Sequence, residues 1–330
     1  MLTKRENMLE VLRGGSPDRF VKQYEAIRFI TKTPYTEKYP EVPAGPGAPA
    51  VKTGWGFYNS WPAGQPGPFP LHDSEHLACP DITRWREYVH APSLDFTEED
   101  WRPCVEEAAK IDRSEYLVTA FNAPGMFELS HHLCEMQNAM MNLILEPEAV
   151  HELLDYISDW YLAYYKQICE HLKPDAFFQH DDWGSQRSPF VSNDMFEEFL
   201  LEPYKKIYGY LHDQGVIVIH HNDSFCAPLV PYMIEMGIDV WQGCLSGNDL
   251  PELIKKYGKD ITFMGGVDCG LVDREDATEE TISQVVEPLC KACGPLHFIP
   301  CSTQGGNMTT YPHVYPLIDQ QIDKMSKELF

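Results

Sequence analysis

The sequence predicts an α/β protein folded as a single (β/α)8 barrel of the TIM type, and three observations support this fold class. Short apolar segments alternate with longer helical ones from about residue 103 to the C-terminus. Their number favours a closed barrel, although the pattern alone leaves a doubly wound sheet open. The length of 330 residues is common for one α/β barrel, and 43% hydrophobic residues supply a large core. We therefore expect one domain over residues 1–330.

The first hundred residues have a different character. Residues 3–14 predict an amphipathic helix, which Gly14 and Gly15 end. Residues 34–72 are rich in proline, glycine and aromatic side chains, and this composition is too apolar for a disordered linker. We expect an ordered loop or β-excursion there that covers a pocket. Residues 1–100 are then an N-terminal extension to the barrel.

The alternating elements follow in order along the rest of the chain. Strand-like runs, short and apolar, are expected at residues 116–120, 176–179, 216–220, 240–242, 261–264 and 297–300. Helical patterns occupy residues 138–173, 193–213, 228–236, 250–257, 278–290 and 312–328. Pro147 is expected near a helix start, where proline is tolerated.

The charge and the cysteines exclude several classes of protein. With 26 basic and 50 acidic residues, the formal charge is −24, and such a surface repels nucleic acid and anionic membranes. It also disfavours a substrate with many carboxylates. The ten cysteines are scattered, the N-terminus shows no apolar signal segment, and no apolar run is as long as a membrane span. We expect a reduced, cytoplasmic protein.

Histidine, aspartate and cysteine cluster directly after the predicted strands. The residues concerned are His180, Asp181 and Asp182 after the second strand, His220 to Asp223 after the third, Gln242 at the fourth and Cys301 after the last. In a barrel the carboxyl ends of the strands meet on one face, which holds the active site. Zinc favours such a mixture of nitrogen, sulfur and oxygen ligands, so the sequence predicts a metal site there.

Each of these residues also has an ordinary structural interpretation. His220 and His221 are adjacent on a strand, so their side chains point to opposite sides, and we favour His221 as the functional one. Asp181 and Asp182 pose the same choice, because one of them may cap a helix or order a loop. Cys301 is a metal ligand or a core thiol with about equal weight.

Other features are weaker signals. Asp223 is a ligand or a turn residue. Cys290 and Cys293 form a CxxC pair without a second pair, which indicates two ordinary helix cysteines. His131 and His132 lie in a helical stretch, where structural or pocket-wall roles are expected.

Several motifs resemble those of the uroporphyrinogen decarboxylase-like superfamily, in the expected order and over nearly the whole chain. They are residues 1–20, 55–57, 61–67, 181–187, 221–239, 265–268 and 299–301. The resemblance implies a (β/α)8 barrel and either a decarboxylase or a cobamide-dependent methyltransferase. The decarboxylases carry an Arg-Gln-Ala-Gly-Arg segment that grips carboxylates, and this sequence has no such run. The resemblance therefore favours the methyltransferase branch, including components of O-demethylases.

The resemblance also implies the metal ligands. The methyltransferases bind zinc through a His-x-Cys pair and a later cysteine, and the matching residues are His221, Asp223 and Cys301, with aspartate in place of the first cysteine. Fewer thiolates leave zinc a stronger Lewis acid, better suited to an oxygen than to a thiol. We therefore expect methyl transfer from a small, methoxylated aromatic donor to a corrinoid.

The roles of the remaining candidates follow from this hypothesis. Asp182, His180 and Asn222 are expected to be catalytic. Substrate-binding residues are expected to be Trp55, Phe57, Trp61, Trp183 and Gln242, although ordinary packing is an equal alternative for the aromatic ones. The chain has no corrinoid-binding Asp-x-His-x-x-Gly run, so a partner protein supplies the cobalamin. Relatives imply a homodimer.

Three other functions remain open at this stage. The first is transfer in the opposite direction, from a methylcorrinoid to a thiol or folate, which two sulfur ligands on the metal would support. The second is a metal-free lyase of the uroporphyrinogen decarboxylase type. The third is a ligand-binding or assembly protein without catalytic activity.

Overall fold

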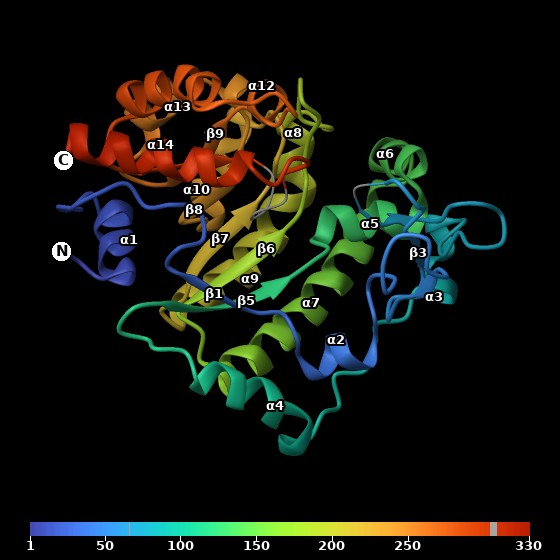
Figure 1. Ribbon diagram of the computed structural model, residues 1–330. Coiled ribbons are helices and arrows are strands. Elements are labelled where there is room, and N and C mark those ends of the chain that lie inside the picture. Colours follow the sequence, from blue (N-terminus) through green and yellow to red (C-terminus); the bar gives the residue numbers. More distant parts are fainter. Residues whose placement is uncertain (66, 304–308) are drawn as a thin grey trace.

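A computed structural model describes residues 1–65, 67–303 and 309–330 of the chain, and its centre is a curled parallel sheet (Figure 1). The strand order is β1-β5-β6-β7-β8-β9-β10, so each strand pairs with the next one along the chain. The strands are β1 (Ile27–Ile30), β5 (Leu117–Asn122), β6 (Ala176–His180), β7 (Ile217–His221), β8 (Val240–Cys244), β9 (Thr262–Val267) and β10 (Phe298–Ser302). Helices cover the outside of this sheet, as the barrel prediction requires.

One apolar cluster fills the inside of the curl. It contains side chains from both edge strands as well as from the strands between them, and these are Ile27, Leu117, Ala176, Phe178, Ile219, Val240, Met264, Ile299 and Cys301. Residues of β1 and β10 thus share one interior, which is the arrangement of a TIM-type barrel. The predicted fold class is confirmed. In the described residues the sheet has seven strands where the sequence predicts eight, and no strand pairing joins β10 to β1.

Helix α1 (Lys4–Arg13) closes the end of the barrel where the strands begin. Met8 and Val11 reach into the interior cluster. The backbone of α1 also bonds to the chain just before two strands, from Arg5 N to Glu115 O at 3.0 Å and from His297 N to Val11 O at 3.2 Å. The other end of the barrel, where the strands finish, is the end at which barrel enzymes carry their active sites.

Most of the other helices fall in the predicted ranges, whereas those between residues 34 and 134 and the one at 269–272 are additional to them. In chain order, the other helices are α2 (Pro34–Lys38), α3 (Trp85–Tyr88), α4 (Glu98–Ala109), α5 (Met126–Cys134), α6 (Met136–Leu145), α7 (Pro147–Leu172), α8 (Asn193–Phe196), α9 (Glu202–Asp213), α10 (Val230–Met236), α11 (Leu250–Tyr257), α12 (Cys269–Val272), α13 (Glu279–Cys293) and α14 (Val314–Leu329). Short helical turns are η1 (Ile82–Arg84), η2 (Glu197–Leu201, a π-helical turn), η3 (Ala227–Leu229) and η4 (Ser246–Asn248). The predicted helix at 138–173 is two helices, α6 and α7, and Pro147 begins the second.

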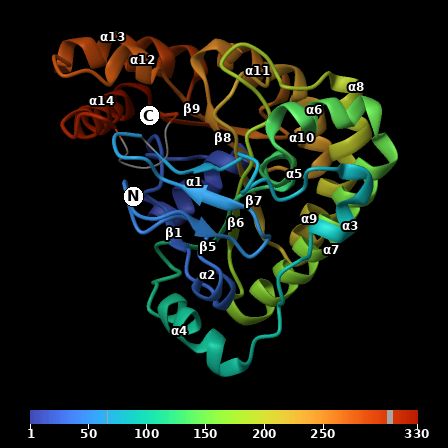
Figure 2. The ribbon, with the colours of Figure 1, turned by 90° about the vertical axis from the view of Figure 1, so that its right-hand side faces the viewer.

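A second, antiparallel sheet forms the predicted β-excursion. Its strands are β2 (Val51–Lys52), β3 (Tyr58–Ser60) and β4 (Phe69–Pro70). It lies beside α5 and α6, away from the chain termini, which lie near each other (Figures 1 and 2). Residue 66 of this segment is outside the described residues. The barrel strand β1 lies within residues 1–100, so this segment supplies part of the barrel as well as the excursion.

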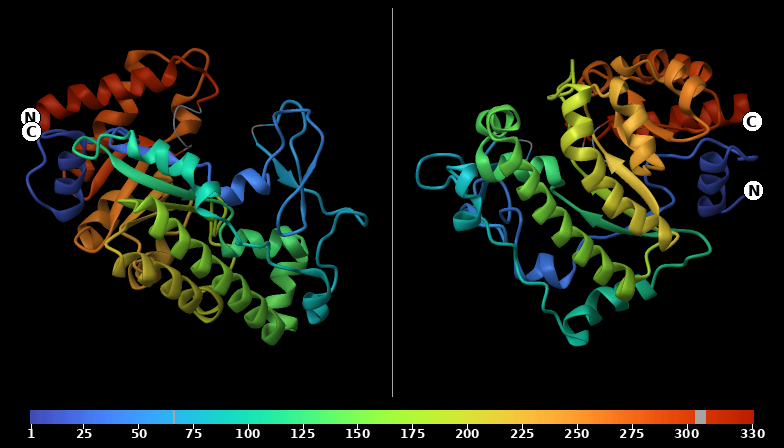
Figure 3. Two further views of the ribbon diagram at one scale, coloured as in Figure 1. Left: turned by 90° about the horizontal axis from the view of Figure 1, so that it is seen from below. Right: turned by 180° about the vertical axis from the view of Figure 1, so that it is seen from behind.

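The long helices α7 and α9 pack side by side on the outside of β5, β6 and β7 (Figure 3). Tyr161, Tyr165 and Tyr204 on these helices are buried against the sheet. This packing fixes the position of the three strands whose ends carry the polar residues described next.

Candidate metal centre

Three side chains from the ends of β6 and β7 meet at the barrel mouth. They are His180, Asp182 and His221, and one possible ligand atom from each lies within 4.8 Å of the others. The register of the sheet explains the meeting, because His180 and His221 are direct neighbours across the β6–β7 pair. Two imidazoles and one carboxylate form a common ligand set for a catalytic zinc ion, which keeps a further position open.

Both imidazoles are held by their Nδ1 atoms. His180 Nδ1 lies 2.9 Å from Glu128 Oε2, and His221 Nδ1 makes a short hydrogen bond with Gln242 Oε1. The two rings stack with centroids 4.5 Å apart. With Nδ1 as the donor in both bonds, Nε2 is the ring atom left for a metal, at His221 directly and at His180 once its second proton is displaced. Partners that orient metal-binding histidines in this way are typical of zinc sites.

The two imidazoles differ in charge. Burial by itself lowers the pKa of His180, but the carboxylates of Glu128, Asp182 and Asp181 outweigh it and raise the pKa to about 10. The pKa of His221 is lowered to about 4, by burial and by the positive charge of His180. His180 therefore carries a proton at neutral pH that a cation bound here would displace.

His220 points to the opposite side of β7, as strand alternation predicts. It is fully buried, with Nδ1 2.7 Å from the Tyr208 hydroxyl and Nε2 3.2 Å from the Asp181 carbonyl oxygen. Its ring packs on Trp183 with centroids 4.0 Å apart. The environment of His220 is therefore that of a packed, hydrogen-bonded core histidine.

Asp181 binds the start of α5. Its carboxylate accepts hydrogen bonds from Phe127 N at 3.1 Å and Glu128 N at 2.7 Å, and from Trp183 Nε1 at 2.8 Å. The hydroxyl of Tyr204 donates a further, short bond. Burial, followed by the charge of Glu128, raises the pKa of Asp181 to about 7. Asp181 thus caps the helix and places Glu128 against His180.

Asp223 adjoins the three residues without joining them. Its backbone N–H donates to Asp182 Oδ1 at 2.9 Å. Burial and the neighbouring charge of Asp182 raise the pKa of the Asp223 carboxyl to about 7. The residue also lines an open cleft of about 710 Å³ together with Asp268, Cys269 and Thr303. The structure therefore places Asp223 between the metal group and the cleft.

The expected ligand Cys301 lies elsewhere. It is 2% exposed and packs in the interior cluster with Met264 and Ile299, and burial raises the pKa of its thiol well above the usual value. The reason is the length of β10, which runs to Ser302, so that Cys301 lies within the strand rather than beyond it. In the described part of the chain the metal group does not include Cys301, which corrects the expected ligand set.

Asn222 and Trp183 serve the loop structure. Asn222 Nδ2 donates to Cys226 Sγ at 3.2 Å, and its Oδ1 accepts from Ser224 and from Trp183 N. Trp183 is 1% exposed, with its indole N–H bonded to Asp181. Both residues lack a free face for a substrate, so the expected catalytic role of Asn222 and stacking role of Trp183 are not supported.

The expected aromatic residues of the excursion separate into different places. Trp55 is 2% exposed and packs on Tyr156 and Trp160 of α7, as a core side chain does. Trp61 bonds through its indole N–H to Gln65 O within the excursion. Phe57 alone turns towards α5, where its ring lies 5.2 Å from that of His132.

Glu128 and the role of Gln242 were not found by sequence reasoning. Gln242 was expected to bind substrate, but its Oε1 holds His221, and its Nε2 is buried with no partner among the described residues. Glu128 lies on helix α5 after β5, away from the strand ends at which polar residues indicate a barrel site. The available signal was its position one turn before His131 and His132.

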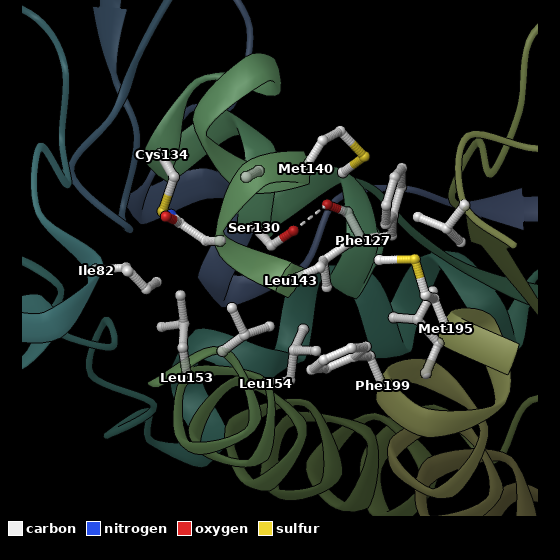
Figure 4. A pocket seen from close by; sticks show the side chains of 15 residues that line it. Ile82, Phe127, Ser130, Cys134, Met140, Leu143, Leu153, Leu154, Met195 and Phe199 are labelled. Carbon is white, nitrogen blue, oxygen red and sulfur yellow. Dashed lines mark hydrogen bonds between the residues drawn. The ribbon is translucent and has the colours of Figure 1, made fainter. Parts of the chain in front are cut away.

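The opposite face of α5 borders an apolar pocket. Phe127, Ser130 and Cys134 face α6, α7 and η2 there, and apolar side chains such as Met140 and Leu154 surround it (Figure 4). Ser130 Oγ is bonded to the Phe127 carbonyl oxygen at 2.6 Å. The pocket therefore offers little polar chemistry and is separate from the metal group.

The chain resembles known proteins both in sequence and in fold. The sequence matches the family described as Uroporphyrinogen decarboxylase (URO-D) over residues 94–302. Among solved structures, a methyltransferase from Methanosarcina mazei superimposes with a TM-score of 0.69 at 14% identity, covering 98% of this chain and 99% of that chain. A D-psicose 3-epimerase solved in the presence of D-fructose gives a TM-score of 0.32 at 10% identity, covering 71% and 82%. That second likeness carries no argument.

No curated protein matches the sequence. Within the described residues, none of the helices has the length and apolar character needed to cross a membrane.

Proposed function

Because the chain belongs to the uroporphyrinogen decarboxylase (URO-D) family, and because His180, Asp182 and His221 form a metal-ligand group at the mouth of its barrel, we propose that it is a zinc-dependent methyltransferase. The structural likeness to a methyltransferase over almost the whole chain supports the proposal. The single observation that carries it is the His-Asp-His group with its two oriented imidazoles.

The donor set fits zinc better than it fits magnesium or calcium. Two imidazole nitrogens suit zinc, whereas magnesium and calcium prefer oxygen ligands alone. Glu128 and Gln242 hold the imidazoles from behind, which is the support that zinc ligands require. When bound, zinc supplies a Lewis acid that makes an ether oxygen a better leaving group.

The residues of the site favour an uncharged donor. Glu128, Asp181, Asp182 and Asp223 surround the group, and the described lining of the adjacent cleft contains no lysine or arginine. A substrate with several carboxylates, as a decarboxylase of this family would need, is repelled here. We therefore assign a small methoxylated aromatic donor.

The acceptor is the reduced cobalt of a corrinoid on a separate protein. In the transfer, Co(I) supplies an electron pair to the methyl carbon and becomes Co(III), while the bond from carbon to oxygen breaks and its pair leaves with the aromatic oxygen. That oxygen then takes up a proton. In this proposal the chain positions the donor at its metal group, to which Asp182 and His180 belong.

A second candidate function is transfer from a methylcorrinoid to a thiol. A thiol acceptor favours a metal with sulfur ligands, and the group found here has none. The first function is therefore preferred.

A transfer assay tests the proposal. Zinc-loaded protein, a reduced corrinoid protein and a methoxyarene are mixed, and methylcobalt is followed by its absorbance. We expect methylcobalt with the wild type and none with His221→Ala, because the substitution removes a ligand. His151→Ala, on the exposed surface of α7, is the matched control and retains the activity. Transfer that survives His221→Ala contradicts the zinc assignment.

A further inference from the structure

The chain at the end of the excursion is bonded to the C-terminal end of α5. The last carbonyl groups of a helix have no partner within the helix itself. Here His72 Nε2 donates to the His132 carbonyl oxygen at 3.0 Å, and Cys79 N donates to the Leu133 carbonyl oxygen at 2.8 Å. Residues 72–79 thus supply the partners that two neighbouring carbonyl groups of α5 lack.

These backbone bonds bring two cysteine side chains together. Cys134 is the last residue of α5 and directly follows Leu133, whose carbonyl group accepts the bond from Cys79. The thiols of Cys79 and Cys134 are hydrogen-bonded to each other. A disulfide bond requires Cα atoms that lie about 4.4–6.8 Å apart. Since one backbone hydrogen bond joins the two segments beside the thiols, a disulfide can bridge them without a large backbone movement.

The two thiols differ in acidity. The pKa of Cys79 is lowered, because the hydrogen bond from the Cys134 thiol to its sulfur outweighs the opposing effect of burial. The same hydrogen bond, together with burial, raises the pKa of Cys134 well above its usual value. The thiolate is the form of cysteine that attacks an oxidant. Cys79 is therefore the thiol that reacts first, and Cys134 lies in contact with it as the resolving thiol.

Burial limits the oxidants that can reach this pair. Both side chains are only 2% exposed, whereas Cys269 at the barrel mouth is partly exposed. A bulky thiol reagent therefore modifies Cys269 before it modifies either buried thiol. A small, uncharged oxidant such as hydrogen peroxide needs only a slight opening between the excursion and α5.

We propose that Cys79 and Cys134 are a redox-active pair, which peroxide converts into a disulfide bond between the end of the excursion and α5. The Cys79 thiolate attacks one peroxide oxygen, the bond between the two oxygens breaks, and a sulfenic acid and a first water molecule form. The Cys134 thiol then attacks the oxidised sulfur, and the sulfenic oxygen leaves as a second water molecule. Both sulfur atoms are oxidised and the peroxide is reduced. A dithiol reverses the reaction by exchange.

The disulfide would fasten α5 at its C-terminal end, while Asp181 caps its start and Glu128 contacts His180 there. It would also close residues 79–134 into a loop, which restricts the unfolded chain more than the folded one. Oxidation should therefore raise the midpoint of thermal unfolding. This inference concerns the excursion and is independent of the methyl-transfer proposal.

Peptide mapping of the full-length protein tests the pair. The folded protein is treated with hydrogen peroxide, alkylated in denaturant and digested without a reductant. We expect one linked peptide pair that joins Cys79 to Cys134, in a protein lighter than the reduced form by two hydrogen atoms. The midpoint of thermal unfolding should rise by about 3–6 °C. Dithiothreitol should reverse both changes.

Three variants serve as comparisons, each first shown by circular dichroism to be folded. Cys79→Ser and Cys134→Ser should lose both the linked peptides and the rise in the midpoint. Cys169→Ser, which removes a buried thiol of α7, should keep both. The mapping of the wild type stands even if a variant does not fold. Oxidised wild type in which both thiols remain free or are linked to other cysteines overturns the proposal, as does an equal rise in Cys79→Ser.

Discussion

At the scale of single residues, the two imidazoles of the metal group differ in the residue that is hydrogen-bonded to Nδ1. A carboxylate holds His180 and an amide holds His221, so the first keeps its proton and the second stays neutral. The amide of Gln242 selects the tautomer of His221 in which Nε2 is free. In the proposed metal site Gln242 would therefore act through His221, as a positioning residue.

This role gives a prediction for Gln242→Leu. Without the amide oxygen, His221 loses its fixed orientation, and we expect zinc affinity to fall by about 10- to 100-fold. Competition with a chromophoric chelator measures the affinity. Gln214→Leu, at the exposed end of α9, serves as the control. Equal zinc affinity in the wild type and Gln242→Leu is the result that refutes the positioning role.

The sequence identified some of these residues and not others, for geometric reasons. Strand alternation correctly turned His221 towards the mouth and His220 away from it. Cys301 was misplaced because the expected strand ended at Pro300, whereas β10 continues to Ser302. Glu128 was missed because a hydrogen bond between a helix and a strand end leaves no pattern in either segment alone.

At the scale of elements, the contact between α5 and the loop after β6 organises the site. Gly125 permits this contact, because a Cβ atom built there lies 2.2 Å from Asp181 Cβ. The backbone can therefore bring Phe127 N and Glu128 N to the Asp181 carboxylate. A small residue at the start of α5 thus determines where Glu128 and His131 stand.

Gly125→Ala tests this contact. The added methyl group has to displace Asp181 or α5, and we expect a loss of about 1–3 kcal/mol in the free energy of unfolding, together with weaker zinc binding. Urea denaturation measures the first effect. Gly209→Ala on the exposed side of α9, with nothing within 4 Å of its Cβ, should be neutral or slightly stabilising. Similar unfolding free energies for both variants argue against the close contact.

The excursion depends on a buried carboxyl group. Glu41 accepts a hydrogen bond of 2.5 Å from the Tyr35 hydroxyl, and burial raises its pKa from 4.5 to about 7. The folded state thus binds a proton more strongly than the unfolded state between these values. Stability from this group is complete below about pH 4.5 and is lost as the pH rises through 7.

We therefore expect a pH-dependent contribution that Glu41→Gln removes. The loss for the wild type is about 3 kcal/mol across this window, since each unit of pKa corresponds to about 1.4 kcal/mol. Unfolding free energies of both proteins at pH 5 and pH 8 measure it. If the difference between the two proteins is the same at both pH values, Glu41 does not titrate as described.

The elements themselves were largely predictable from the sequence. All six strands expected from residue 116 onwards begin within about one residue of the observed strands, because apolar β-branched runs are local signals. The strand β1 was not expected, since its four residues include Arg28 and precede an aromatic-rich segment. Its identity comes from pairing with β5, which is a long-range contact.

At the scale of the whole molecule, the net negative charge of the chain suits the candidate metal group at the barrel mouth. The chain carries a formal charge of −24, and the mouth adds buried carboxylates to two imidazoles. Such a field attracts a divalent metal ion and disfavours anionic substrates. It therefore supports the proposal that this member of the URO-D family does not act on a substrate with several carboxylates.

Zinc content is the most direct measurement of the central claim, that His180, Asp182 and His221 hold the metal. Elemental analysis of purified wild type, His221→Ala and Cys301→Ala, each shown by circular dichroism to be folded, gives the zinc per chain. We expect about one ion per chain in the wild type and in Cys301→Ala, and none in His221→Ala. Zinc that is lost from folded Cys301→Ala, or that remains in His221→Ala, contradicts the assignment.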